Sequence, residues 1–259
     1  LDEGKNLLPP RERKQRKIEF IGDSFTSASG NEYTYQDVPP DVEKYTNVAE
    51  GFGPLIADHF DAQFMLSSIS GFGMVLDWEG KKINSIPNVY DRTLNVAEYP
   101  KWDFSKWIPN LVVIGLGLND YSGFGGWNGP ISKDNRELFK AEYHKFITRV
   151  FDLYPKVKIL AVAAHVTWIQ DVVKEIVKEE NEAGIKDLYY ADYPYYTGGY
   201  VNNGHPNVET HHKIAERLIS AIEKMNVWEQ HIESVEIKDV ESIKDSSDTI
   251  PKTLDQKIK

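Results

Sequence analysis

The sequence predicts a three-layer α/β/α sandwich built on a mostly parallel five-stranded sheet. Short apolar segments rich in β-branched residues alternate along the chain with longer segments whose apolar residues recur at helical spacing. Two of the short segments, LVVIGL at 111–116 and VKILAVA at 157–163, are apolar almost throughout. Such runs are typical of parallel strands that are covered by helices on both faces.

The first elements follow from this alternation. KIEFI at 17–21 predicts a strand that runs into the turn Gly22-Asp23-Ser24. Residues 47–60 predict a helix, because their apolar side chains return at intervals of three and four. A second strand is expected at 63–69, ending at a glycine-rich turn.

The later elements are bounded by proline and glycine. A helix is expected at 135–154 and ends before Pro155, and the apolar run 157–163 follows it. The next helix, 167–183, has Gly184 just past its end. A short fifth strand at 188–191 and a final helix at 206–225, with proline in its first turn, complete the domain.

Composition limits the possible functions. The net charge of −10 argues against a nucleic-acid partner and, more weakly, against an anionic membrane surface. The chain of 259 residues has no cysteine, which excludes disulfides, thiolate metal sites and a cysteine nucleophile. Residues 1–16 are polar and basic and include Pro9-Pro10, so they suit a linker or N-terminal extension before a domain at 17–225. Residues 226–259 are polar and are expected to form a C-terminal extension.

Four candidate site residues follow predicted strands or precede the last helix, so they should meet at the carboxyl edge of the sheet. Ser24 in the GDS turn is a candidate nucleophile, although Asp and Ser are also common in ordinary turns. Gly71 could offer a backbone N–H to an oxyanion, or it is simply a loop glycine. Asn119 could add a side-chain N–H, or it caps a helix. His205, fixed by the proline that follows it, is the candidate base.

The other histidines favour ordinary roles on helices, after a strand or in the C-terminal segment. No further acidic or histidine ligands stand at metal-binding spacing beside the pair His211 and His212. We therefore expect no metal and no cofactor.

The order of these motifs resembles that of the SGNH hydrolases: GDS, then Gly, then GxND, then HP near the end. More closely, KIEFIGDSFTSASGNE, WDFSKWIPNLVVIGLGLND and GHPN resemble the catalytic domain of carbohydrate esterase family 2. The resemblance implies a flavodoxin-like sandwich and a secreted acetyl esterase that acts on xylan and glucomannan. It also implies a β-sandwich domain ahead of the hydrolase domain, to which residues 1–16 would be the linker.

One position departs from the superfamily pattern. Many SGNH hydrolases have Asp two or three residues before the histidine, where this chain has Asn202 and Asn203. An amide cannot stabilise imidazolium as a carboxylate does, so we expect a Ser–His dyad. Backbone carbonyls or the side chain of Asn203 would orient His205, and Asp192 is a weaker alternative.

The resemblance also implies an oxyanion hole made of the N–H groups of Ser24 and Gly71 and the amide of Asn119. Loop aromatics are candidate walls of a sugar subsite, with burial of the loops as the alternative explanation; they are Trp168, Trp127, Tyr33 and Tyr35. Two other functions stay open at this point. One is an esterase or lipase of the same fold acting on another acyl ester, and the other is a non-catalytic glycan-binding protein.

Overall fold

Five parallel strands form the centre of the computed structural model, which describes residues 12–94 and 98–228. Along the sheet the order is β2-β1-β3-β4-β5, and every neighbouring pair is parallel. The strands are β1 (Arg16–Gly22), β2 (Ala62–Ser68), β3 (Leu111–Gly115), β4 (Lys158–Ala163) and β5 (Leu188–Asp192). The predicted parallel sheet of five strands is confirmed.

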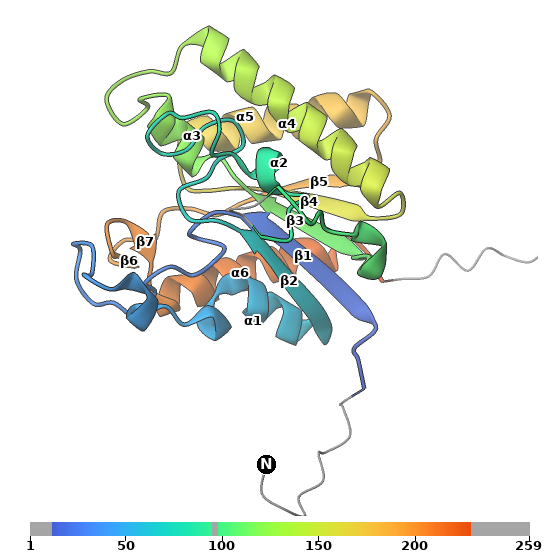
Figure 1. Ribbon diagram of the computed structural model, residues 1–259, viewed down its shortest axis with the longest axis horizontal. Helices are drawn as coiled ribbons and strands as arrows, with labels where there is room; N and C mark the ends of the chain where they lie inside the picture. Colours follow the sequence, from blue (N-terminus) through green and yellow to red (C-terminus); the bar gives the residue numbers. More distant parts are fainter. Residues whose placement is uncertain (1–11, 95–97, 229–259) are drawn as a thin grey trace, which may run out of the picture. The chain divides into compact units, whose positions relative to one another are not determined.

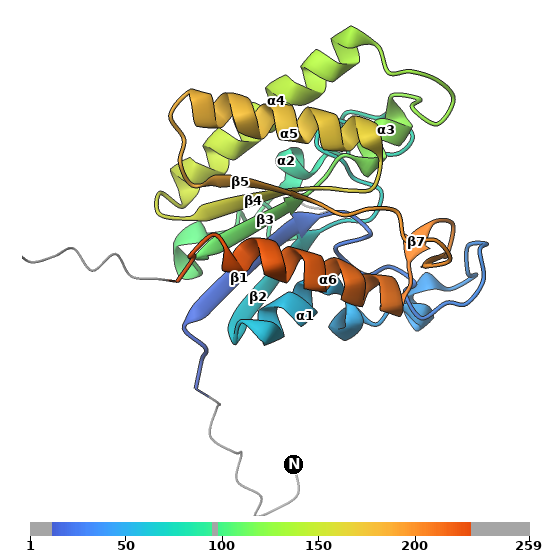
Figure 2. The same cartoon turned by 180° about the vertical axis from the view of Figure 1, so that it is seen from behind.

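Helices cover both faces of this sheet (Figures 1 and 2). One face carries α1 (Phe52–His59) and α6 (Val208–Glu223), and the other carries α4 (Lys133–Leu153) and α5 (Thr167–Glu182). Because both faces are covered, Ile18, Phe20 and residues 111–114 are almost wholly buried. The three-layer sandwich is therefore as predicted.

Several short elements lie between these helices and strands. They are η1 (Val42–Tyr45), η2 (Val48–Glu50), α2 (Ile86–Val89), η3 (Phe104–Lys106), α3 (Leu118–Gly123), β6 (Tyr200–Val201) and β7 (His205–Pro206). β6 and β7 pair antiparallel. Within the described ranges, no helix is both long and apolar enough to cross a bilayer.

Two predicted helices begin later than the sequence indicated. The helix expected from residue 47 is divided into η2 and α1, with Gly51 extended between them and Pro54 in the first turn of α1. Proline lacks the N–H that a helix interior requires, so the helix starts again close to it. The last helix was expected from Pro206, but that residue belongs to β7. Instead Asn207 caps α6, its side chain accepting from the N–H of Thr210 at 2.9 Å.

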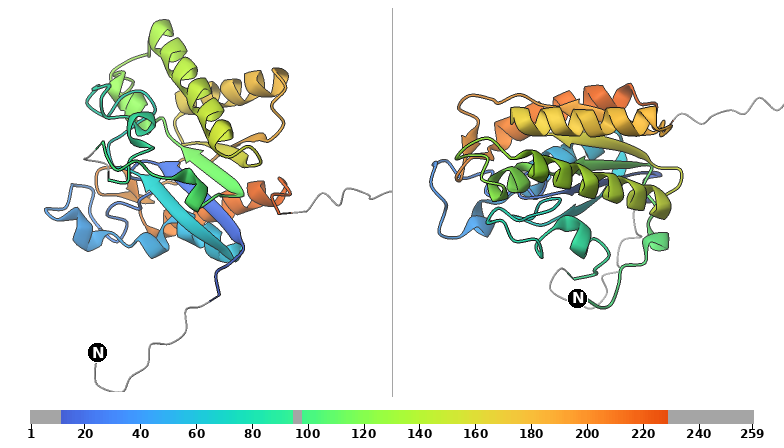
Figure 3. Two further views of the ribbon diagram at one scale, coloured as in Figure 1. Left: turned by 45° about the vertical axis from the view of Figure 1, so that its right-hand side comes forward. Right: turned by 90° about the horizontal axis from the view of Figure 1, so that it is seen from above.

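The loops that follow the carboxyl ends of the strands gather on one side of the molecule, the left side in Figures 1 and 3. This arrangement brings together segments far apart in the sequence. Of the predicted linker, residues up to 11 lie outside the described residues, as does the C-terminal extension from residue 229 onward.

Candidate active site

Ser24 lies just beyond the end of β1. Its backbone carbonyl accepts from the N–H of Ser29 at 2.9 Å, so the chain turns back on itself directly after the serine. The turn is tight, because a Cβ on Gly22 would lie 1.9 Å from the Thr26 hydroxyl. Only glycine fits there. The strand and the turn together fix the serine at the carboxyl edge of the sheet.

His205 lies beside Ser24, although 181 residues separate them in the sequence. Its Nε2 is 2.8 Å from the Ser24 Oγ, and its Nδ1 is 2.5 Å from the backbone carbonyl of Asn202. A carbonyl oxygen only accepts, so Nδ1 carries the hydrogen and Nε2 is free to accept from the serine hydroxyl. Burial lowers the pKa of His205, while the Asn202 carbonyl acts weakly in the opposite direction. The ring is therefore a neutral base near pH 7.

The group that orients the imidazole is thus the backbone of Asn202. The side chain of Asn203 is exposed and forms no hydrogen bond with the described part of the chain. The side chain of Asn202 points elsewhere, because its amide donates to the Ser29 carbonyl at 3.1 Å. Asp192 pairs with Arg217 at 2.5 Å and with the hydroxyl of Tyr190 at 3.0 Å.

Two backbone N–H groups beside the serine have no acceptor within the described residues: those of Ser24 and Gly71. Gly71 has a φ of 83°, a conformation that favours glycine, and a Cβ there would lie 3.0 Å from the ring of Trp78. The Asn119 amide is nearby in α3, but it already donates to the Phe72 carbonyl at 2.9 Å and to Asp23 at 3.2 Å. The three expected donors of an oxyanion hole therefore line one cleft.

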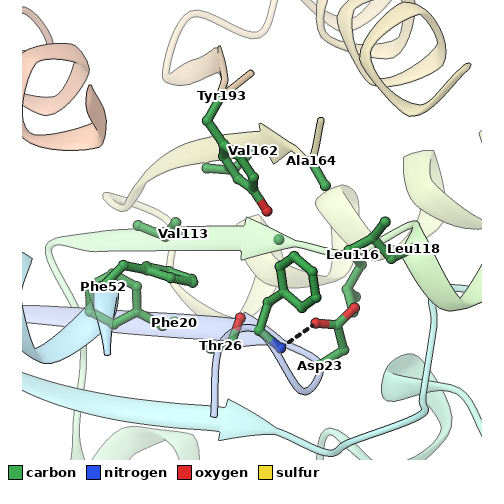
Figure 4. Close-up of a pocket in the computed structure, with 12 residues that line it drawn as sticks. Phe20, Asp23, Thr26, Phe52, Val113, Leu116, Leu118, Val162, Ala164 and Tyr193 are labelled. Carbon is green, nitrogen blue, oxygen red and sulfur yellow. Dashed lines mark hydrogen bonds between the residues drawn. The ribbon is translucent and has the colours of Figure 1, made fainter. Parts of the chain in front are cut away.

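Two buried carboxyl groups support these donors. Asp120 accepts the N–H groups of Met74, Val75 and Leu76 at 2.7, 2.6 and 3.0 Å, which fixes the loop that follows Gly71. Asp23 accepts from the N–H of Phe25 at 3.0 Å (Figure 4). Burial raises the pKa of Asp23 to about 7 and that of Asp120 to about 6.

The serine and histidine lie in a cleft of about 910 Å³. Trp127, predicted as a wall, lines it and is 62% exposed. Trp168 does not line the cleft: it sits in the first turn of α5 and packs against Phe139, with ring centroids 5.3 Å apart. Tyr33 does not line it either, because its ring packs on Tyr45 at 4.9 Å.

Several cleft residues were not identified from the sequence. They are Gln36, Trp78, His165, Tyr195 and Tyr200. In the sequence, Trp78 stands close to Gly71, and Tyr195 and Tyr200 belong to a tyrosine-rich segment ahead of His205. These patterns could have identified those three residues. Among the described residues, no group of three or more histidine and acidic side chains could hold a metal ion.

Residues 18–218 match the model of the GDSL-like lipase/acylhydrolase family. The chain belongs to this family. The matched range contains β2 to β5 and all of β1 except its first two residues, together with Ser24, Gly71, Asn119 and His205. Membership indicates a carboxylic ester hydrolase, which agrees with the serine–histidine geometry.

Curated relatives carry carbohydrate esterase names. The cellulase/esterase CelE of Acetivibrio thermocellus is 32% identical over 233 residues, covering 87% of this chain and 27% of CelE. An acetylxylan esterase / glucomannan deacetylase of Cellvibrio japonicus is 37% identical over 133 residues, covering 51% of this chain and 36% of the relative. The chain thus spans about a third or less of the length of these two relatives.

Solved structures share the fold. A family two carbohydrate esterase from Clostridium thermocellum, in complex with cellohexaose, is 31% identical with a TM-score of 0.75, covering 85% of this chain and 67% of that one. The acetyl xylan esterase Est2A of Butyrivibrio proteoclasticus has the same TM-score at 20% identity, over 83% of this chain and 66% of its own. At that identity the second likeness concerns the fold alone.

Proposed function

We propose that this domain removes O-acetyl groups from plant cell-wall polysaccharides such as xylan and glucomannan, through an acetyl-enzyme on Ser24. One observation carries the proposal: the Ser24 hydroxyl lies 2.8 Å from a neutral imidazole nitrogen, beside two N–H groups with no acceptor in the described chain, in an open cleft. Esterase chemistry needs this combination of nucleophile, base and oxyanion donors. The names of the relatives support the substrate class.

Acylation begins with proton transfer. The Ser24 hydroxyl gives its proton to Nε2 of His205 as Oγ bonds to the acetyl carbon. The carbonyl oxygen becomes an oxyanion that accepts from the N–H groups of Ser24 and Gly71. The imidazolium that forms keeps its Nδ1–H on the Asn202 carbonyl, whose dipole stabilises the charge.

The intermediate then collapses. The bond between the acetyl carbon and the sugar oxygen breaks, and His205 returns its proton to that oxygen, so the sugar leaves as an alcohol. A water molecule next gives a proton to Nε2 and attacks the acetyl-enzyme. Acetate leaves, and the serine regains its hydrogen.

Asn119 adds a third donor only by changing partners. Both hydrogens of its amide already have protein acceptors, and the contact with Asp23 is the longer one at 3.2 Å. An oxyanion would therefore take over or share the hydrogen that faces Asp23. The bond to the Phe72 carbonyl holds the amide in place during this change.

The cleft is suited to a sugar polymer. It is open, and the exposed fractions of Trp78 and Trp127 are 59% and 62%. Aromatic side chains offer large, rigid contact areas and lose little conformational entropy on binding. The apolar faces of sugar rings can pack against them. Because the substrate is a polymer outside the cell, we also propose that the enzyme is secreted. A preceding β-sandwich domain, as the family resemblance implies, stays part of this proposal.

The test is acetate release from acetylated xylan and acetylated glucomannan, beside hydrolysis of 4-nitrophenyl acetate and butyrate. Ser24→Ala should lower turnover by about 10⁴–10⁶-fold, because the step needs the nucleophile. Ser220→Ala, an exposed serine on α6, is the matched control. Activity on the small esters alone would indicate an esterase or lipase for another acyl substrate. Glycan binding without hydrolysis would indicate the non-catalytic alternative.

A further inference from the structure

A second histidine lies in the cleft and takes no part in the mechanism above. His165 follows β4 and lines the same cleft as Ser24 and His205. The ring of Phe25 is near both imidazoles, with centroid distances of 5.6 Å to His205 and 6.4 Å to His165. His165 thus shares the cleft with Ser24, and no hydrogen bond joins the two side chains.

Two tyrosines surround this histidine. The rings of Tyr195 and Tyr200 are stacked in parallel, 4.6 Å apart with an angle of 7°. The His165 ring centroid is 5.2 Å from that of Tyr195 and 5.1 Å from that of Tyr200. Tyr195 is 57% exposed, so it presents the free side of the pair to solvent, and both rings line the cleft.

The hydroxyl of Tyr200 contacts one of the two ring nitrogens of His165. The Tyr200 hydroxyl lies 3.3 Å from Nδ1 of His165. Burial raises the pKa of Tyr200 to about 12, so the phenol keeps its proton. Burial also lowers the pKa of His165, so the ring is neutral near pH 7.

A neutral phenol can donate to Nδ1, and in that tautomer Nε2 of His165 bears the hydrogen. That Nε2 has no hydrogen-bond partner within the described residues. In that tautomer the cleft wall offers one oriented N–H donor beside an exposed aromatic ring. A sugar ring matches both features, because it has an apolar C–H face for stacking and oxygens that accept hydrogen bonds.

We propose that His165, oriented by Tyr200, determines specificity by donating its Nε2–H to an oxygen of the sugar residue whose ester Ser24 attacks, while Tyr195 stacks on the same glycan. This role rests on the proposed function, and it concerns the alcohol part of the ester only. The acetyl group reacts with Ser24 in the same way whatever alcohol it is attached to.

Two substrates that share the acetyl group separate the two parts of the reaction: acetylated xylo-oligosaccharide and 4-nitrophenyl acetate. His165→Phe keeps the ring shape and removes the donor, and should lower kcat/KM on the oligosaccharide about 10–100-fold more than on 4-nitrophenyl acetate. Most of this loss should appear in KM, because the donor binds substrate and transition state alike. His165→Gln, whose amide restores a donor near the position of Nε2, should recover part of the loss.

Two further measurements separate this role from a merely structural one. Tyr200→Phe should shift kcat/KM in the same direction by a smaller factor, and ¹⁵N NMR of the wild type should show hydrogen on Nε2 of His165. His59→Phe is the matched control, because His59 ends α1 near the amino edge of the sheet and contacts Glu223 at 3.4 Å.

Equal losses on both substrates for His165→Phe, or hydrogen on Nδ1, would overturn the role of His165 and leave the proposed function intact. A wild type that hydrolyses only 4-nitrophenyl acetate would instead overturn the substrate class, and this role with it.

Discussion

The imidazole of His205, the proposed base, is oriented by a main-chain carbonyl. Asn202 and Asn203 both adopt positive φ, 41° and 54°, a conformation that asparagine tolerates better than most residues. Their N–H groups donate to the carbonyls of Tyr35 and Gln36 at 2.9 and 2.7 Å. This turn directs the Asn202 carbonyl at the imidazole, so a side-chain carboxylate is not needed to choose the tautomer.

Asn202→Asp tests whether the backbone carbonyl of Asn202 is sufficient to orient His205. The substitution adds the carboxylate that many SGNH hydrolases have, but it faces the Ser29 carbonyl and not the imidazole. We expect kcat not to rise and the free energy of unfolding to fall by roughly 1–3 kcal/mol, because a buried donor is replaced by an acceptor. Urea unfolding and turnover of 4-nitrophenyl acetate measure the two effects.

Asn203→Gly is the control for that substitution, because Asn203 is exposed and glycine keeps its positive φ. Its turnover should stay within about twofold of the wild type, as for most surface substitutions. A faster Asn202→Asp variant with unchanged stability would mean that the new carboxylate reaches His205.

The pH dependence of turnover reports on the same imidazole. Burial is the main cause that lowers the pKa of His205, so the base loses its proton below the usual value of 6.5. Activity should therefore rise with pH and reach half its plateau below pH 6.5. The check is kcat/KM on 4-nitrophenyl acetate from pH 4 to 8. A midpoint at or above 6.5 would contradict the effect of burial.

At the level of elements, the strands were predicted well because each is a short apolar run. Predicted and observed strand ends differ by at most one residue, as in 157–163 against Lys158–Ala163. Helix starts were less accurate because they depend on local capping. The apolar periodicity at 47–60 does not indicate the interruption at Gly51. His205-Pro206 forms a strand only because it pairs with β6 in the folded protein.

The cleft walls were the least predictable part of the site. Trp168 and Trp127 look alike in sequence, but Trp168 belongs to a helix whose neighbours Ile169 and Val172 are buried, so its ring packs inward. Trp78, Tyr195 and His165 come from three separate loops. Their meeting depends on the paths of those loops, which no local pattern encodes.

The loop after β2 is held by a single carboxylate, that of Asp120. Asp120→Asn keeps one acceptor oxygen but places an N–H₂ group against backbone N–H donors. We expect a loss of roughly 1–3 kcal/mol in the free energy of unfolding and up to about 100-fold in kcat, because Gly71 shifts with the loop.

Thermal unfolding and turnover of 4-nitrophenyl acetate test that substitution. Asp103→Asn provides the comparison, since this aspartate caps only the short turn η3 at the surface. Unchanged turnover in Asp120→Asn would mean that the loop keeps Gly71 in place without the carboxylate.

Across the whole molecule, the acidic groups fall into two classes. Two carboxyl groups of the candidate site are buried away from water. Asp23 and Asp120 are 2% and 0% exposed, and both lie at the carboxyl edge of the sheet. Other acidic groups behave in the opposite way: ion pairs with Lys140 hold the pKa values of Glu175 and Glu179 below their usual range. The two classes act in different pH windows. Glu175 and Glu179 lose their stabilising contribution only as pH falls below their unfolded pKa of 4.5, whereas Asp23 and Asp120 act above their unfolded pKa of 3.8.

The contribution of Asp23 to the stability of the domain should fall as pH rises from about 4 to about 7. Buried histidines act in the opposite direction, because burial lowers the pKa of His211 from 6.5 to about 3, so the effect of Asp23 is measured by difference from a variant that lacks it. Desolvation raises the folded pKa of Asp23 from 3.8 to about 7, so the folded state binds more protons than the unfolded state across this window. The stabilising contribution of the protonated form is present below the unfolded value and is lost through the folded one. Asp23→Asn cannot titrate at this position, so from pH 4.5 to 7.5 the wild type should lose stability relative to the variant by on the order of several kcal/mol. Urea unfolding of both proteins at pH 4.5, 6 and 7.5 measures the difference, and parallel curves for the two would contradict the raised pKa of Asp23.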